Sequence, residues 1–319
     1  MTEALDQLAT LGKASGDSLR LQILRVLSTE SLGVLELSGI FAMRQPAMSH
    51  HLKVLAQAGL VMTRKEGNTV FYRRALPPYG SVLEPVVRSL FQALDEAVIP
   101  EEQSIRLNEI REQRAEQSKA FFARHVAAFR HHQELIADHD LYARTVADLI
   151  ANTRFPGDVL AMELGPGEGA FLKTLSQRFQ TVCAVDNSEA MLARTIATIK
   201  AQELTNIECI QGEIHTLKHL MQGFDCIVAN MVLHHVPSPA SIFSRAGQLL
   251  KPGGSLLISE LSRHDQDWVR ESCGDLWLGF TADELDQWAQ DAGLTQGESQ
   301  YLGLRNGFQI QVRRFFSPE

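Results

Sequence analysis

The sequence has few cysteines and no long apolar run, and both absences narrow the class of protein. Its four cysteines stand apart, without a C-x-x-C pair, so neither a disulfide framework nor a zinc knuckle is indicated. No stretch approaches the roughly 18 uninterrupted apolar residues of a membrane span. The first residues lack the basic and apolar segments of a signal peptide. We therefore expect a cytoplasmic protein with no membrane partner.

Aromatic residues are also scarce, at 7%, but 45% of the residues are apolar and 21% are charged, which is typical of a globular protein. A length of 319 residues predicts about two domains. The net charge of -8 at first argues against nucleic acid, yet it is unevenly distributed. Residues 1–100 hold ten Lys and Arg against nine Asp and Glu, whereas residues 101–319 hold 20 against 29. The two parts therefore differ in net charge. Within the first part, residues 44–74 carry six cations and one anion.

Residues 16–58 contain three stretches with helical spacing of apolar residues. Short helices are predicted at about 16–28 and 33–43. A third is predicted at about 46–58, because Pro46 suits a first helical position and Gly59 suits the residue past a helix end. Three apolar residues of this helix share one face: Met48, Leu52 and Leu55. The opposite face is polar.

Residues 60–74 alternate β-forming residues around Glu66-Gly67-Asn68, which predicts a hairpin with a Gly-Asn turn. Two helices followed by a basic hairpin form the winged helix-turn-helix arrangement. The run SHHLKVLAQAGLV (49–61), with EGNTVFYRR (66–74), resembles the ArsR family of bacterial winged-helix repressors. The resemblance extends over about residues 8–95.

This resemblance implies a double-stranded DNA operator and a homodimer. The residues implied to enter the major groove are Gln45, Ser49, His50 and Lys53. Those implied to neutralise phosphates from the hairpin are Arg64, Lys65, Arg73 and Arg74. Metal sensors of the family carry a cysteine pair in the preceding helix, but residues 33–41 contain no cysteine, so thiolate metal sensing is not expected. An amphipathic helix over 83–94 offers a dimer contact.

From residue 155 onward, apolar strands alternate with helices, which predicts a parallel sheet covered on both faces. The predicted fold class is an α+β winged helix-turn-helix followed by an α/β Rossmann-like fold with a mostly parallel sheet. We place a DNA-binding and dimerisation domain at 1–100. A helical connector and lid follow at 101–150, and a cofactor-binding domain at 151–319.

The segment ELGPGEG (163–169) lies where a strand ends and a helix begins. Glycines there allow a sharp turn and a close approach of the backbone to a ligand. Asp186 ends the next strand, at the spacing where an acidic side chain binds ribose hydroxyls. NAD and S-adenosylmethionine are the alternatives. The G-x-G-x-G spacing and the preceding Glu163 favour S-adenosylmethionine, because a carboxylate repels a pyrophosphate and attracts an amino or sulfonium cation.

Residues 163–169 also resemble the first motif of class I methyltransferases. The resemblance continues through DNSEAML (186–192), QGEI (211–214), FDCIVANMVLHHVPSP (224–239) and LLKPGGSLLISEL (249–261), and it covers about residues 118–295. It implies binding of S-adenosyl-L-methionine or S-adenosyl-L-homocysteine by Glu163, Gly165, Gly167, Gly169, Asp186, Asn187, Met191, Gly212, Glu213, Ile214, Asn230 and Met231. Glu213 stands where the family usually has Asp.

No catalytic residue is identified from the sequence. His234 and His235 are interpreted as hydrogen-bonded histidines beside a pocket, with a general base as the alternative. Metal binding by them is not expected, because no cysteine or third ligand stands near them in the sequence. A methyl acceptor is expected to approach from the lid. Its candidate contacts are Phe121, Phe122, Arg130, His131, His132 and Tyr142.

Three hypotheses follow. The first is a DNA-binding repressor whose methyltransferase-like domain senses S-adenosylmethionine or S-adenosylhomocysteine. The second is an active methyltransferase of small molecules with an attached autoregulatory DNA-binding domain. The third hypothesis is arsenic methylation, which the fusion of these two families suggests. Against it, the chain has no paired cysteines. Neither the acceptor, the operator nor the sign of regulation follows from the sequence.

Overall fold

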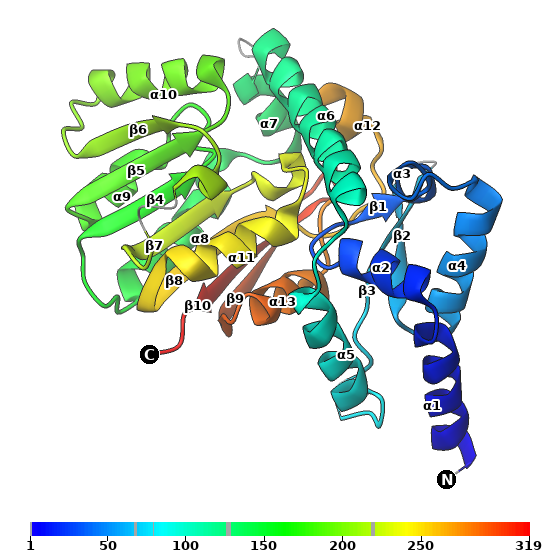
Figure 1. The fold of residues 1–319 in the computed structure, drawn as a ribbon. Helices are drawn as coiled ribbons and strands as arrows, with labels where there is room; N and C mark the ends of the chain where they lie inside the picture. The colour runs from blue at the N-terminus through cyan, green and yellow to red at the C-terminus, as the bar shows by residue number, and fades with distance from the viewer. Residues whose placement is uncertain (1, 67–68, 79, 126–128, 218–220) are drawn as a thin grey trace. The chain divides into compact units, whose positions relative to one another are not determined.

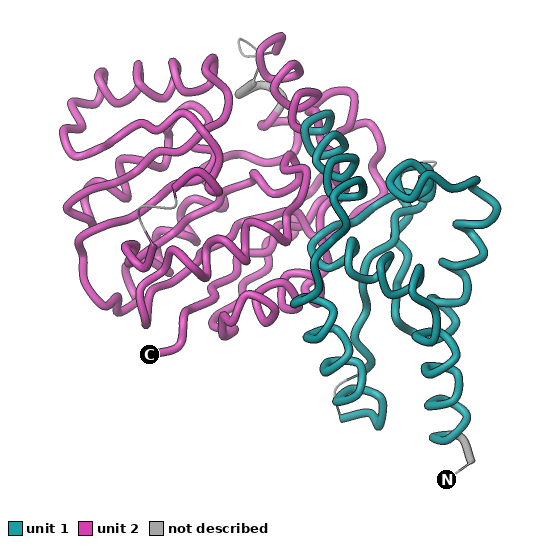
Figure 2. Tube along the Cα trace, viewed as in Figure 1, with its two compact units in different colours: residues 1–114 teal, residues 115–319 magenta. Residues whose placement is uncertain are grey.

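The computed structural model describes residues 2–66, 69–78, 80–125, 129–217 and 221–319, apart from the side chains of 2–3 and 129–132. The chain forms two compact units, one up to Arg114 and one from Ala115 to Glu319 (Figures 1 and 2). The division falls inside helix α6 (Glu101–His125) rather than near residue 100, where we had placed it. The reason is that Leu107 and Ile110 pack into the core of the first unit.

The described residues of the first unit form five complete helices and a small antiparallel sheet in strand order β1-β3-β2. Its elements are α1 (Thr2–Ser15), α2 (Ser18–Val26), β1 (Leu32–Gly33), α3 (Val34–Ile40), α4 (Gln45–Gln57), β2 (Val61–Glu66), β3 (Thr69–Arg74) and α5 (Glu84–Glu96). The predicted helices and hairpin are confirmed to within a few residues. The Gly67-Asn68 turn lies outside the described residues.

Helix α4 begins with Pro46 in its first turn and ends before Gly59, whose φ of +70° is the left-handed conformation that glycine adopts easily. The predicted inward face is fully buried: Met48, Leu52 and Leu55 each have no exposed surface. Val87 and Phe91 of α5 join the same hydrophobic core. Part of the apolar stripe of α5, which we assigned to a dimer contact, therefore packs into the core of the first unit. Val86 of the same stripe is exposed.

The second unit is built on a seven-stranded sheet in the order β6-β5-β4-β7-β8-β10-β9. Its strands are β4 (Leu160–Leu164), β5 (Thr181–Asp186), β6 (Ile207–Gln211), β7 (Phe224–Asn230), β8 (Leu250–Leu261), β9 (Thr295–Gly303) and β10 (Gln309–Phe316). The five strands β4 to β8 are parallel, as predicted. The strand β10 is antiparallel to β8 and β9, and we had not predicted this pair.

Helices cover both faces of this sheet (Figure 1). They are α7 (Phe129–Ile136), α8 (His139–Asn152), α9 (Leu172–Arg178), α10 (Glu189–Ala201), α11 (Pro239–Leu249), α12 (Trp268–Ser272) and α13 (Ala282–Asp291). Helices α8 and α9 pack into one hydrophobic cluster with alternate residues of the central strands. Phe243 of α11 stacks against Trp288 of α13 and Phe315 of β10. The strand order reverses between the parallel neighbours β4 and β7, and open α/β sheets bind their ligands at such a switch point.

Helix α8 belongs to this domain rather than to a connector. Tyr142, Val146 and Ile150 of α8 are at most 2% exposed and lie in the core of the sheet domain. The proposed connector over 101–150 is therefore divided: α8 and the end of α6 belong to the second unit. No helix among the described residues is both long enough and apolar enough to cross a membrane.

Candidate functional site

The loop that follows β4 has the backbone of a ligand cradle. Gly165, Gly167 and Gly169 all adopt left-handed conformations, with φ of +64°, +58° and +80°. A Cβ at Gly165 would lie 2.4 Å from Cγ2 of Val232, so no larger residue fits there without movement. The Gly165 N–H donates to the carbonyl of Val185, which ties this loop to the end of β5. Glycine is therefore required for both conformation and space.

Glu163 lies at the end of β4, only 2% exposed. Its Oε1 accepts a hydrogen bond of 3.3 Å from Nδ2 of Asn230, and Ser259 in turn donates to Oδ1 of Asn230. Its buried Oε2 accepts no hydrogen bond from any residue that the structure describes. Burial raises the pKa of Glu163 to about 8, although the Asn230 bond opposes that shift. A buried carboxylate with a free oxygen fits a cationic ligand group.

Asp186 lies at the end of the neighbouring strand β5. Its Oδ1 accepts a hydrogen bond of 2.8 Å from the Ser188 N–H, and Ser188 caps helix α10. Burial raises the pKa of Asp186 to about 6, against the effect of the Ser188 bond. Asn187 is half-buried next to it, and Met191 of the first turn of α10 is buried. The second carboxylate oxygen remains for a ligand, in agreement with the predicted ribose contact.

The remaining predicted cofactor residues follow β6 and β7. The Gly212 N–H donates to the carbonyl of Asp186, Glu213 is exposed, and Ile214 is buried at the start of the 3-10 helix η2 (Ile214–Thr216). Met231 has a φ of +50°, which is unusual for a residue other than glycine, and its N–H donates to Ser259. The ends of four parallel strands thus bring all the predicted cofactor residues to one edge of the sheet. Their binding of a cofactor remains a prediction.

A cleft of about 420 Å³, including the space at its open mouth, adjoins this edge. It is lined by residues of α6, α7, the segment between β7 and α11, and the segment between α12 and α13: Phe121, Phe122, His125, Gln133, Ile136, Met231, His234, His235, Cys273 and Asp275. Met231 belongs both to the cleft and to the predicted cofactor residues. Of the lid residues, the two phenylalanines reach the cleft, and the buried Tyr142 hydroxyl accepts from Nε2 of Gln133. The side chains of Arg130, His131 and His132 lie outside the described residues.

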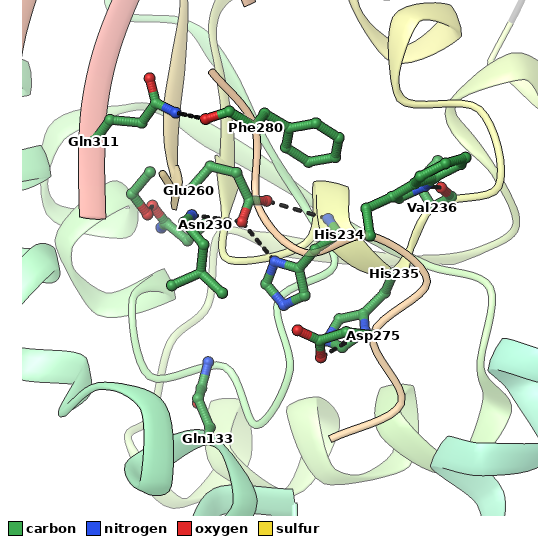
Figure 3. A network of polar contacts seen from close by, with 12 residues as sticks. Gln133, Asn230, His234, His235, Val236, Glu260, Asp275, Phe280 and Gln311 are labelled. Carbon is green, nitrogen blue, oxygen red and sulfur yellow. Dashed lines mark hydrogen bonds and ion pairs between the residues drawn. The ribbon is translucent and has the colours of Figure 1, made fainter. Parts of the chain in front are cut away.

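A charged network lies beside the cleft (Figure 3). Nδ1 of His234, in the 3-10 helix η4 (Leu233–His235), lies 2.5 Å from Oε1 of Glu260 on β8. Burial alone would lower the pKa of His234, but the negative charges of Glu260 and Asp275 raise it to about 9. Burial and the neighbouring charge of His234 hold the pKa of His235 well below its usual value. Both histidines are hydrogen-bonded, as the sequence analysis expected.

Glu260 and Asp275 were missed by the sequence analysis. Glu260 is the charged residue in the buried run Ser255–Leu261 of β8, a signal that marks it as paired. Asp275 is 3% exposed, and burial raises its pKa to about 7 against the effect of the His234 charge. Asp275 lies 40 residues after His235 in an irregular segment, where sequence spacing gives no signal. Burial raises the pKa of the neighbouring Cys273 thiol to about 12, which disfavours the reactive thiolate form.

The candidate nucleic-acid interface is the outer face of α4. The four residues predicted to enter the major groove are all exposed on it: Gln45, Ser49, His50 and Lys53. Together with α3 and the intervening turn, α4 forms a helix-turn-helix whose inward side is buried in the core. The structure thus presents these side chains to solvent, while contact with DNA remains a prediction.

The hairpin arginines differ from the prediction, because three of them are engaged within the domain. Arg64 is 3% exposed and forms an ion pair with the buried Glu66. Arg73 is 8% exposed. Arg74 pairs with Asp95 at 2.9 Å, donates to the carbonyl of Leu24, and lies over the ring of Phe91. In β2, alternation places residues 64 and 66 on the same face, which explains their pairing. Lys65 is the exposed hairpin cation of the four.

Comparisons with known proteins agree with this geometry. A ubiquinone biosynthesis O-methyltransferase of Pseudomonas fluorescens is 28% identical over 149 residues, covering 42% of this chain and 63% of that protein. The same enzyme of Coxiella burnetii is 29% identical over 147 residues, covering 42% and 62%. The chain thus spans less than two thirds of the length of these relatives.

A solved structure shows the same fold. The 1,6-didemethyltoxoflavin-N1-methyltransferase of Burkholderia thailandensis, solved with bound 1,6-didemethyltoxoflavin and S-adenosylhomocysteine, has a TM-score of 0.51 at 18% identity. The match covers 66% of this chain and 91% of that one.

Two families account for the two units of the chain. The family described as "Bacterial regulatory protein, arsR family" matches residues 17–63, which contain α2, α3 and α4. The family described as "Methyltransferase domain" matches residues 129–298, more than half of the chain and most of its sheet domain. The chain therefore belongs to the methyltransferase-domain family, with an ArsR-family helix-turn-helix domain preceding that domain.

Proposed function

We propose that the protein is a DNA-binding transcriptional repressor whose methyltransferase domain binds S-adenosylmethionine or S-adenosylhomocysteine as an effector. The observation that carries this proposal is Glu163, with a buried oxygen that accepts no hydrogen bond from a described residue, beside a loop of three left-handed glycines. Such a site accommodates the protonated amino group of the ligand's amino-acid end. Asp186, one strand away, accepts from the ribose hydroxyls.

The ligand class is supported by the relatives and by charge. The bound S-adenosylhomocysteine of the Burkholderia enzyme occupies a protein of the same fold. The carboxyls of Glu163 and Asp186, at the ends of β4 and β5, disfavour the pyrophosphate of a dinucleotide when they are ionised, because like charges repel strongly where water is excluded. Glu213 stands where the family usually has an Asp that contacts adenine. It is exposed and still acidic, so a carboxylate remains at this position.

The DNA-binding role is supported by the exposed polar face of α4 and by three exposed cations on or near it, Arg44, Lys53 and Lys65. In this proposal α4 lies in the major groove of an operator, and the protein binds as a homodimer in the cytoplasm. The helix that carries cysteines in the family's metal sensors is here α3, and residues 33–41 contain none. The effector site is therefore placed in the methyltransferase domain.

Regulation would follow from linkage between the two sites. A ligand can shift the operator affinity by no more than the difference between its affinities for the DNA-bound and free conformations. The test is to select an operator from a random duplex library and measure binding with and without saturating S-adenosylmethionine or S-adenosylhomocysteine. An unchanged operator affinity with both ligands would overturn the sensor role.

A second candidate function is favoured by the cleft beside Met231. In this alternative the protein methylates a small molecule that binds against Phe121 and Phe122, and the DNA-binding domain controls related genes. Bound S-adenosylmethionine supplies an electrophilic methyl group, which an acceptor nucleophile takes by in-line displacement. The role of the chain is to orient the acceptor and exclude water. Transfer of radiolabelled methyl groups to a metabolite extract would support this alternative, whereas tight ligand binding without transfer favours the sensor.

A further inference from the structure

A cluster of ligating side chains lies in the cleft, separate from the glycine loop. His234 and His235 project from η4, and Asp275 from the segment that follows α12 (Figure 3). One ligand atom from each of these three residues lies within 4.8 Å of the others. Residues from two distant parts of the sequence thus meet at one point, and all three line the cleft.

Each histidine is held by one ring nitrogen, as metal-binding histidines generally are. Nδ1 of His234 bonds to Glu260, whose other oxygen accepts from the His234 backbone N–H at 3.2 Å. Nδ1 of His235 lies 3.3 Å from the carbonyl oxygen of Gly274. Histidine ligands of metals typically donate their second nitrogen to a carboxylate or a backbone carbonyl, which fixes the ring orientation and the tautomer. Both acceptors are present here.

Asp275 gives an independent indication of a cation. Its side chain is completely buried, yet neither carboxylate oxygen accepts a hydrogen bond from a described residue. Nδ1 of the uncharged His235 lies 3.9 Å from its Oδ1, too far for a hydrogen bond, and the charge of His234 acts on it without a hydrogen bond. A buried carboxylate without hydrogen bonds costs several kcal/mol unless a cation or a proton compensates it. This carboxylate faces the cleft, where an ion can reach it.

We propose that His234, His235 and Asp275 bind a divalent transition-metal ion, with Zn²⁺ as the best match. Two imidazoles and one carboxylate form the three-ligand set typical of open zinc sites, whereas Mg²⁺ and Ca²⁺ prefer oxygen ligands. Zinc bonds of about 2.0–2.2 Å require the ligand atoms to close by roughly 1 Å, which side-chain rotation can provide. Glu260 is a positioning residue that orients His234.

The open coordination position faces the same cleft as Met231. A metal there binds an oxygen donor, such as the hydroxyl or enolate of a small molecule, and lowers the pKa of that hydroxyl. The inference goes beyond the proposed repressor function, since neither operator binding nor effector binding requires a metal. It identifies the chemical class of a ligand for the cleft: an oxygen chelator of a transition metal.

The test uses the full-length protein, stripped with a chelator and then titrated with Zn²⁺ against a chromogenic competitor. We expect one site per chain. Asp275→Asn and His235→Gln are each expected to weaken Zn²⁺ binding more than about 100-fold, and Glu260→Gln by about 10- to 100-fold. Titration with Co²⁺ should produce the visible absorption band of a tetrahedral site in wild type and not in Asp275→Asn.

Two matched controls keep the test decisive. His139→Gln removes a histidine of α8 outside the cleft and should leave the affinity unchanged. Cys273→Ser should also leave it unchanged, and a loss as large as that of Asp275→Asn would refute the open coordination position.

Circular dichroism checks folding, and Asp275→Ser replaces any variant that fails it. Equal Zn²⁺ binding by wild type and both ligand variants would overturn the metal site. Stripped protein should still bind S-adenosylhomocysteine, so failure here leaves the repressor proposal intact.

Discussion

Replacement of Glu163 by Gln should weaken ligand binding and raise the thermal stability of the ligand-free protein, and both effects should depend on pH. Glu163 is buried at the end of β4, and its pKa is raised to about 8 by desolvation. Its ionised form is the one that attracts a protonated amino group, so ligand binding is linked to loss of this proton. Gln keeps the shape and the Asn230 contact but cannot ionise.

The magnitude follows from the raised pKa. With a pKa of about 8, roughly 1% of Glu163 is ionised at pH 6 and half at pH 8, so the ratio of the Glu163→Gln dissociation constant to the wild-type one should rise about 50-fold over this range. Taking a ratio removes the titration of the ligand's own amino group, which affects both proteins equally. Asp186, with its pKa near 6, is also unchanged between them.

The same substitution should raise the stability of the ligand-free protein, whereas it weakens ligand binding. The folded, ligand-free protein holds the Glu163 proton more tightly than the unfolded chain, so this group makes stability fall as pH rises from about 4.5 toward 8. Glu163→Gln removes that decline and should melt at a higher temperature than wild type at pH 8. Isothermal titration with S-adenosylhomocysteine and thermal melting provide the two measurements. A dissociation-constant ratio independent of pH would refute the reasoning.

Other substitutions probe the remaining parts of both sites. Asp186→Ala should weaken S-adenosylhomocysteine binding by about 1–3 kcal/mol in calorimetry, because charged hydrogen bonds to the ribose are lost, and should leave ligand-free operator binding intact. Gly165→Ala should lower the free energy of unfolding by about 1–3 kcal/mol in urea titrations, since a φ of +64° and the contact with Val232 both oppose a Cβ. Lys53→Ala should reduce the slope of log operator affinity against log salt by about 0.9, if Lys53 contacts one phosphate. Arg64→Ala should instead destabilise the protein by about 1–3 kcal/mol in urea, because it removes a charged hydrogen bond to the buried Glu66 carboxylate.

The sequence predicted the elements that carry strong local signals. Pro46 and Gly59 bracketed α4 correctly, and the glycines after β4 adopt the left-handed conformations for which glycine is suited. Short runs that are apolar throughout and alternate with helices identified the five parallel strands. These features depend on near neighbours in the chain, which is why one sequence sufficed to predict them.

Features set by long-range packing were missed. The hairpin arginines looked like phosphate contacts, but Arg64 faces inward toward Glu66 and Arg74 reaches Asp95, 21 residues away. The unit boundary fell inside α6 because part of that helix packs into the first core. The fold brings Asp275 to His234 and His235 from 40 residues further along the chain, which makes it the third ligand of the proposed metal site. Sequence spacing alone does not reveal such contacts.

The central claim is a coupling between ligand and operator, and linkage makes it directly measurable. If S-adenosylhomocysteine changes the operator affinity by some factor, operator DNA must change the S-adenosylhomocysteine affinity by the same factor. The measurement is the dissociation constant of S-adenosylhomocysteine with and without saturating selected operator, in wild type. We expect a change of about 5- to 150-fold, the usual range of such couplings. Identical dissociation constants in the two conditions, with S-adenosylmethionine behaving likewise, would contradict the claim.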